Sequence, residues 1–333
     1  MIDDAFICTA VREVAVGVKT VVLAPRRPAL VRFEAGQYVT IEFDVEGDSV
    51  VRSYTIASPP TRPERIAITV KRTDDGWVSR WLHAGGITPG TVVRVGEPQG
   101  SFTRDAHPAS SYLLLTAGVG ITPALSMLRE SYDLGDVHDI VLVHSQRRSS
   151  DVPYGEEISW MARQLPGFRA EYTFSDVDGR LDVDRLRRLV PDVMDREVFI
   201  CGPDSYRSSA RSAALAIGAR SERIHEEAFT HDPPAEPAIE AQASAGSYRI
   251  EFVSPQISID CAPNATILAA ALAAGLTLPS SCAQGLCGTC KSTLVSGTVD
   301  MQHGGGIRPR EIAAGKVLLC CSRPLSDLVI APP

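Results

Sequence analysis

Three closely spaced cysteines constrain the fold of this chain more than any other feature. They lie in the stretch CAQGLCGTC, residues 282–290, and the adjacent pair Cys320 and Cys321 follows later in the sequence. Four thiolates in this order form the ligand pattern of a [2Fe–2S] cluster, whereas structural zinc sites usually combine two close pairs of Cys or His residues. The spacing therefore predicts an iron–sulfur site, with zinc as the alternative. The predicted ligands are Cys282, Cys287 and Cys290, with Cys320 or Cys321 as the fourth.

The residues around these cysteines suit such a cluster. Ala283, Gly285 and Gly288 are small, so the loop can turn its backbone N–H groups toward the sulfur atoms. Adjacent side chains on a strand point to opposite faces. We therefore expect only one of Cys320 and Cys321 to bind iron.

Length and composition describe the rest of the chain in outline. The 333 residues are enough for two or three domains, and 44% hydrophobic with 22% charged residues is typical of a globular protein. A net charge of −7 without a basic run argues against a nucleic-acid partner. The longest apolar run, TILAAALAAGLTL, is too short to span a bilayer, and the acidic start MIDDAF is unlike a secretory signal. We expect a cytoplasmic protein that binds no membrane.

The middle third alternates between strand and helix patterns. SYLLLTAGVG is an apolar strand that runs into glycines, ITPALSMLRESYD follows as a helix, and the last strand of the series is EVFICGP. This alternation predicts a Rossmann-like parallel sheet with helices on both faces. Such sheets bind ligands beyond the carboxyl ends of their strands. The segments AGVGITP and CGPDS fall at those ends.

The glycines in TAGVGITP indicate a nucleotide site. Gly118 and Gly120 let the backbone approach a pyrophosphate at the start of a helix. Pro123 stands where a dinucleotide fingerprint has its third glycine, but proline suits the first turn of a helix. A plain strand-to-helix turn is the alternative interpretation. Asp176, after the strand AEYTFS, suits a ribose hydroxyl and repels a 2′-phosphate, so NADH is favoured.

The first hundred residues are rich in β patterns and turn residues, which favours an antiparallel barrel over a sandwich. In VRSYTIAS, strand alternation puts Arg52 and Tyr54 on one face, a combination that suits an anionic ligand with a flat ring. GWVS, residues 76–79, can open a short helix and offer backbone donors to a phosphate.

The last part of the chain forms another small domain in this interpretation. The strands SYRIEFVS and QISIDCAP are followed by the helix NATILAAALAAGL, with Asn264 as its N-cap and Gly275 as its end. The preceding segment is rich in Pro, Ala and Glu and predicts a linker at 230–247.

Taken together, these motifs resemble the ferredoxin–NADP reductase superfamily. In particular, the chain is similar to the three-domain reductase components of bacterial oxygenases, and the segment from Met301 to Ser322 looks like the reductases of glycine betaine demethylase-type Rieske oxygenases. The resemblance implies a multidomain α/β plus β protein. Its expected parts are a flavin-binding antiparallel β-barrel at 1–104, an NAD-binding α/β domain at 105–229, the linker at 230–247, and a plant-type β-grasp [2Fe–2S] ferredoxin domain at 248–333.

The resemblance also implies roles for individual residues. Thr55 would lie near flavin N5 and Cys201 beside the nicotinamide, and Cys320 would be the fourth cluster ligand. FAD is implied rather than FMN. The remaining residues expected to bind the flavin or the nucleotide are Arg52, Ser53, Tyr54, Gly76, Val78, Ser79, Gly118, Gly120, Thr122, Gly202, Pro203 and Phe229, with Glu227 beside them.

The implied activity is electron transfer from NADH through FAD and the [2Fe–2S] cluster to a terminal oxygenase. A Rieske non-haem iron demethylase is the favoured partner. The alternatives are a hybrid-cluster protein and a diiron or steroid hydroxylase. A redox sensor that uses its cluster as a switch is the alternative from another class.

Overall fold

The computed structural model divides the chain into two compact units, one ending at Phe229 and one beginning at Thr230. The predicted linker lies outside the described residues except for Ser247, and so does Phe229. Among the described residues, no helix has the length and apolar character that a membrane crossing needs. The described residues are 5–74, 76–136, 138–228, 247–254, 256–276, 278, 285, 288, 290–303, 307 and 309–332.

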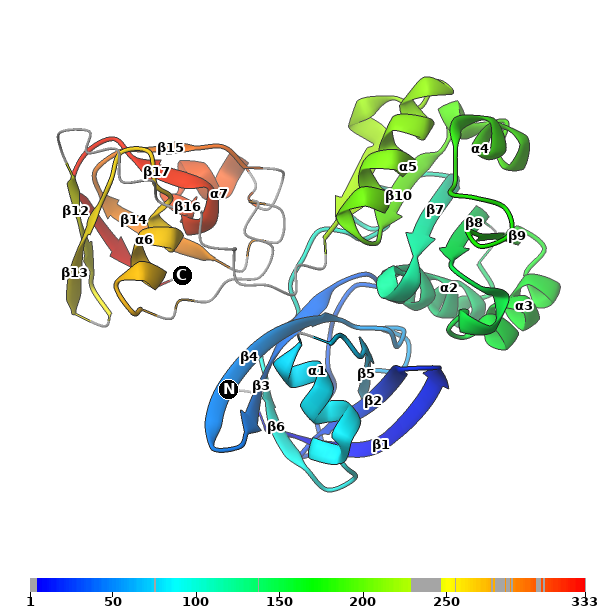
Figure 1. Ribbon diagram of the computed structural model, residues 1–333, viewed down its shortest axis with the longest axis horizontal. Helices are drawn as coiled ribbons and strands as arrows, with labels where there is room; N and C mark the ends of the chain where they lie inside the picture. Colours follow the sequence, from blue (N-terminus) through cyan, green and yellow to red (C-terminus); the bar gives the residue numbers. More distant parts are fainter. Residues whose placement is uncertain are drawn as a thin grey trace. The chain divides into compact units, whose positions relative to one another are not determined.

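An antiparallel sheet in the order β4-β3-β6-β1-β2-β5 forms the first part of the N-terminal unit (Figure 1). An antiparallel bridge between Ile56 and Ile68 joins the chain after β4 to β5, so the two ends of the sheet meet. The expected barrel is confirmed. Its elements are β1 (Ala5–Ala15), β2 (Val18–Pro25), β3 (Tyr38–Val45), β4 (Asp48–Thr55), β5 (Ile66–Lys71), α1 (Trp77–Trp81) with a π-turn at Leu82–Gly86, and β6 (Val92–Val95).

The second part of this unit is a parallel sheet in the order β11-β10-β7-β8-β9, with helices on its faces (Figure 1). Alternation along β7 explains the two faces, because Leu114 packs in the core with α2 and α3 while Leu113 and Leu115 pack with α4 and α5. The elements are β7 (Ser111–Ala117), α2 (Ile121–Leu134), β8 (Asp139–Gln146), α3 (Gly155–Gln164), β9 (Phe168–Phe174), α4 (Val183–Leu189), β10 (Glu197–Cys201), α5 (Asp204–Ala216) and β11 (Ile224–Glu227).

The barrel and the parallel sheet share part of one hydrophobic core. Ala57 and Phe102 of the barrel region belong to the same buried cluster as Leu125 of α2. Gly36 makes this approach possible, since a Cβ atom there would lie 2.1 Å from the carbonyl oxygen of Phe102 and 2.8 Å from the Cε atom of Met127. Its φ of +103° also favours glycine. The shared core fixes the barrel and the parallel sheet against each other.

The C-terminal unit contains a mixed sheet in the order β13-β12-β18-β14-β16, with α6 packed into its core. Two expectations need correction. Thr266 caps α6, with its side chain accepting a hydrogen bond from the Ala269 N–H at 3.3 Å, in place of Asn264. Cys320 and Cys321 belong to a 3₁₀ turn, so strand alternation is not what separates them. The elements are β12 (Tyr248–Phe252), β13 (Ile257–Cys261), α6 (Ile267–Ala273), β14 (Lys291–Ser296), β15 (Val299–Met301), α7 (Pro309–Ala313), β16 (Lys316–Leu318), β17 (Ser322–Pro324) and β18 (Leu328–Ala331).

Candidate functional site

The glycine-rich turn between β7 and α2 lies against the end of β10. A Cβ atom at Gly120 would be 2.4 Å from the carbonyl oxygen of Cys201 and 2.8 Å from the backbone nitrogen of Gly202, so only glycine allows this approach. Gly118 has φ of +58° and open space at its Cβ position. The Thr122 hydroxyl closes the turn by donating to the carbonyl of Val119 at 3.0 Å. The backbone is therefore open to a ligand at Gly118 and tightly packed at Gly120.

A cavity of about 230 Å³ opens beside this turn. Lys71, Arg147 and Arg180 line it, and among its described lining residues none is acidic. No ion pair is recorded for these three cations among the residues that the structure describes. A cationic cavity at the carboxyl ends of parallel strands fits a dinucleotide, whose phosphates are anionic. The remaining lining residues are Ala117, Gly118, Ser145, Gln146, Thr173, Ser175, Gly179, Leu181, Pro203, Ser205, Tyr206 and Ser209.

Cys201 ends β10 and is fully buried. Burial, and to a smaller extent the charge of Glu227, raises the pKa of its thiol well above the ordinary value. A protonated thiol is a poor nucleophile, so Cys201 is suited to contact a neutral ring and not to covalent catalysis. Of the residues that follow, Gly202 packs close to the ring of Tyr206, and Pro203 lines the cavity.

Strand β4 carries the residues predicted to contact the flavin. The Thr55 hydroxyl, which is buried, donates to a carboxylate oxygen of Glu227 at 3.2 Å. This contact brings β4 of the barrel and β11 of the parallel sheet together, beside Cys201. Burial raises the pKa of Tyr54, against the lowering effect of the nearby Arg52 charge. Ser53 pairs with Thr40 across the sheet.

Gly76 forms the N-cap of α1 with no side-chain cap. A Cβ atom at Gly76 would lie 2.2 Å from the hydroxyl oxygen of Thr73 and 2.4 Å from that of Ser79, so a larger residue there would have to displace both hydroxyls. The Ser79 hydroxyl donates to the Gly76 carbonyl at 3.0 Å, whereas Val78 points into the barrel core. The backbone N–H groups at this helix start remain the predicted phosphate donors.

The predicted cluster site is described in part. Cys282 and Cys287 lie outside the described residues, and the described ones contain no group of three or more potential ligands. Cys290 and Cys320 are both buried, and the Cys320 N–H donates to the Cys290 sulfur at 3.4 Å. The Gly285 N–H donates to the Cys320 sulfur at 3.3 Å. Two buried sulfurs that accept backbone N–H bonds fit an iron–sulfur cluster, whose thiolates need such donors.

The structure separates the expected ribose partner from the cavity. Asp176 is exposed and is not among the residues that line the cavity, although its neighbour Ser175 is. The role of Asp176 therefore stays a prediction.

Lys71 and Tyr206, which line the cavity, were not predicted from the sequence. Lys71 comes from a barrel strand distant in sequence, and Tyr206 follows the CGP motif without a signal of its own.

Three protein families match consecutive parts of the chain. Residues 8–103 match the oxidoreductase FAD-binding domain, residues 114–211 the oxidoreductase NAD-binding domain, and residues 251–325 the 2Fe-2S iron-sulfur cluster binding domain. The protein is therefore an oxidoreductase whose cofactors are FAD, NADH and a [2Fe–2S] cluster.

Comparison with whole proteins defines the class further. The glycine betaine monooxygenase reductase subunit of Pseudomonas aeruginosa is 37% identical, over 97% of this chain and 93% of that protein. The stachydrine N-demethylase reductase subunit of Rhizobium meliloti is 35% identical, over 89% and 87%. A solved structure of phthalate dioxygenase reductase has the same fold, with a TM-score of 0.64 and 23% identity, over 98% of this chain and 97% of that one. This chain belongs to the family of three-domain oxygenase reductase subunits.

The close approach at Gly120 gives a first testable prediction. We expect Gly120→Ala to raise the KM for NADH about tenfold or more, because overpacking against the Cys201 backbone costs about 1–3 kcal/mol. Steady-state reduction of ferricyanide measures this, together with flavin content. Gly135→Ala at the far end of α2 is the control, since φ there is +65° but no atom lies within 4 Å of the new Cβ. An unchanged KM in Gly120→Ala would contradict the prediction.

Proposed function

We propose that this protein supplies electrons from NADH to a Rieske-type oxygenase that removes a methyl group from a quaternary amine. The observation that supports this most is the sequence similarity to two reductase subunits named for glycine betaine and stachydrine. They are 37% and 35% identical to this chain, over 97% and 89% of its length. Both names denote quaternary ammonium compounds. The terminal substrate would bind the oxygenase, and this chain would provide its reducing equivalents.

The residues of the chain account for binding and orientation in this proposal. When bound, the flavin takes a hydride from NADH and passes electrons singly to the cluster. Arg52 would hold the anionic end of the flavin, and Tyr54 would lie against its ring. The Thr55 hydroxyl, oriented by Glu227, would present its oxygen to the flavin edge. The protonated thiol of Cys201 would exclude water from the nicotinamide.

Anaerobic titration of the purified protein with NADH tests the proposed relay. Bleaching of both the flavin and the iron–sulfur absorbance is expected. Mixing with a glycine betaine or stachydrine oxygenase component, followed by assay of formaldehyde, tests the proposed partner. If NADH bleaches both bands but neither substrate is demethylated, the partner assignment is wrong and the relay stands. An unchanged spectrum with NADH would remove the relay itself.

The hydrogen bond between Thr55 and Glu227 gives a second prediction. We expect Thr55→Val to slow flavin reduction by NADH about 10- to 100-fold, since a hydrogen bond to a charged group contributes about 1.5–3 kcal/mol. Stopped-flow absorbance measures the rate, and the flavin content should stay unchanged. Thr9→Val on β1 is the control, because its hydroxyl is exposed and contacts only the Val22 carbonyl among its recorded hydrogen bonds. A wild-type rate in Thr55→Val would show that the hydroxyl has no part in this step.

A cytoplasmic location is proposed as well. Cys8, Cys201, Cys261, Cys290 and Cys320 carry free thiols, and the predicted cluster needs free thiolates, which a reducing compartment maintains. Expression with and without an export signal tests this, since export should reduce the cluster content.

A further inference from the structure

Helix α2 connects the two places where this reductase would handle its reactants. Its first residue, Ile121, follows directly on the Gly118–Gly120 turn beside the nucleotide cavity. Eight residues later, at Arg129, the helix contacts the barrel segment that continues from Thr55. At 1.5 Å per residue, about 12 Å of helix separates these points. A single rigid element therefore extends from the nucleotide turn to the flavin strand.

Two hydrogen bonds to carbonyl groups of buried residues fix α2 to that segment. Arg129 donates from its NH1 group to the carbonyl of Ala57 at 2.8 Å, and the Ser126 hydroxyl donates to the carbonyl of Ser58 at 2.7 Å. Ala57, Ser58 and Ser126 are all buried. Residues three apart lie on one face of a helix, so both donors meet the same segment. Water cannot easily replace either bond.

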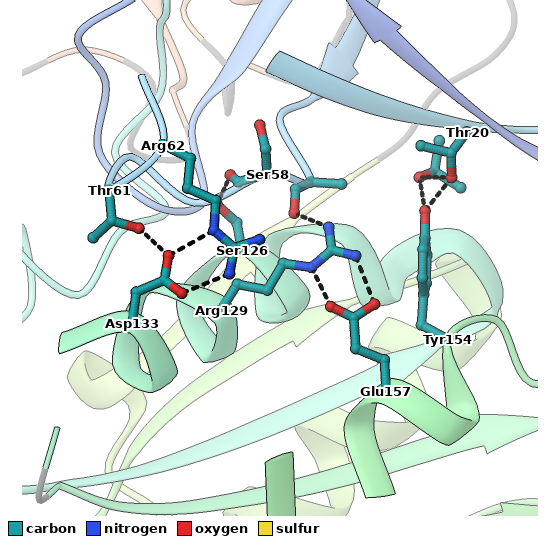
Figure 2. Close-up of polar contacts among 11 residues, drawn as sticks. Thr20, Ser58, Thr61, Arg62, Ser126, Arg129, Asp133, Tyr154 and Glu157 are labelled. Atoms are coloured by element: carbon teal, nitrogen blue, oxygen red, sulfur yellow. Dashed lines mark hydrogen bonds and ion pairs between the residues drawn. The ribbon is translucent and has the colours of Figure 1, made fainter. Parts of the chain in front are cut away.

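The guanidinium of Arg129 is held from three sides. Its Nε and NH2 groups each donate to a carboxylate oxygen of Glu157 on α3 at 2.7 Å (Figure 2). It also lies 5.1 Å from the ring centre of Tyr154. The Tyr154 hydroxyl in turn bonds to the hydroxyls of Thr20 and Thr69 on two barrel strands. With its planar group fixed in this way, the NH1 group of Arg129 is held toward the Ala57 carbonyl.

We propose that Arg129 is a positioning residue for hydride transfer. It would set the distance between the nucleotide turn before α2, which packs against Cys201, and the flavin edge at Thr55, from a place outside both predicted binding sites. This inference rests on the proposed NADH-to-flavin step. Because a displacement of about 1 Å lowers such a rate about 100-fold, a bond that fixes Ala57 two residues after Thr55 has a direct effect on the chemistry.

The same helix offers a matched control. Arg62 forms a bidentate ion pair with Asp133 near the end of α2, at 2.6 and 2.9 Å (Figure 2). Its side chain is 48% exposed, compared with 14% for Arg129. Arg62→Met therefore removes a more exposed bidentate ion pair between the barrel segment and α2, four residues beyond Ser58, and leaves the bonds to Ala57 and Ser58 in place.

Stopped-flow reduction of the holoprotein over a range of NADH concentrations separates the limiting rate from the apparent Kd. In Arg129→Met the limiting rate should fall 10- to 100-fold, with the Kd within twofold of wild type and the flavin content retained. In Arg62→Met both constants should stay within twofold. Arg129→Lys keeps a donor for the Ala57 carbonyl but not the bidentate pair, so its rate should lie between those of wild type and Arg129→Met.

Ser126→Ala removes the second bond alone and provides an independent variant if Arg129→Met folds poorly. Its limiting rate should fall in the same direction by a smaller factor. The proposal is overturned if Ser126→Ala and Arg129→Met both react at the wild-type rate, or if each loss of rate follows a loss of flavin. If wild-type protein is not reduced by NADH, the proposed function fails first.

Discussion

Purified Cys320→Ser protein is expected to lack the absorbance of an iron–sulfur cluster, whereas Cys321→Ser protein keeps it. The Cys320 sulfur is buried and accepts the Gly285 N–H bond. The half-buried Cys321 thiol donates to the Leu318 carbonyl at 3.7 Å, as an ordinary thiol does. Serine is a harder ligand than a thiolate and holds iron of a cluster less well.

Activity should separate the two variants equally clearly. Cys320→Ser should still reduce ferricyanide with NADH through its flavin, but reduction of a one-electron protein acceptor should fall more than about 100-fold. Cys321→Ser should keep both activities. Iron and sulfide analysis, visible absorbance and the two assays measure these results. A Cys321→Ser protein without cluster, or a Cys320→Ser protein with one, would reverse the ligand assignment.

A pH effect on stability is expected from His144 in the centre of the parallel sheet. Burial lowers the pKa of His144 to about 3 from 6.5. The unfolded chain therefore binds a proton that the folded one does not, in the range between these values. Stability falls as the pH decreases through this window, by about 1.4 kcal/mol for each pH unit. Above pH 6.5 this group has no effect on stability.

Urea unfolding followed by tryptophan fluorescence measures this, because all three tryptophans, at 77, 81 and 160, belong to the N-terminal unit. His144→Asn removes the titrating ring but can keep a hydrogen bond with Thr116, whose hydroxyl lies 2.7 Å from Nδ1. Between pH 6 and 4, the slope of the free energy of unfolding against pH should decrease in this variant by the equivalent of about one bound proton. The control His303→Asn, in the other unit, should leave it unchanged. If His144→Asn keeps the wild-type dependence of unfolding free energy on pH, His144 is not the group responsible.

Local patterns were sufficient to predict much of this molecule. The strand-to-helix alternation and the turn before Pro123 gave the parallel sheet and its ligand-binding edge. The barrel followed from β patterns separated by turns, whereas its closure at the Ile56–Ile68 bridge was seen in the structure alone. The cysteine spacing indicated the cluster, which the 2Fe-2S family match supports.

Contacts between distant segments could not be predicted in the same way. Lys71 reaches the nucleotide cavity from the barrel, and Arg129 meets Ala57 across 72 positions of sequence. The predicted cap of α6 was wrong by two positions, because the side chain that reaches the Ala269 N–H is that of Thr266, and Asn264 lies two residues too early. Pairings of this kind depend on how elements pack, which periodicity does not contain.

The division into two compact units has a consequence for evolution. The barrel and the parallel sheet share a core, and the C-terminal unit has a core of its own around Ile250 and Leu318. Substitutions in the core of the C-terminal unit therefore need no repacking of the core that the barrel and the parallel sheet share. Recognition of an electron acceptor can diverge under selection while the chemistry of NADH oxidation is inherited intact, so one reductase framework can come to serve many oxygenases.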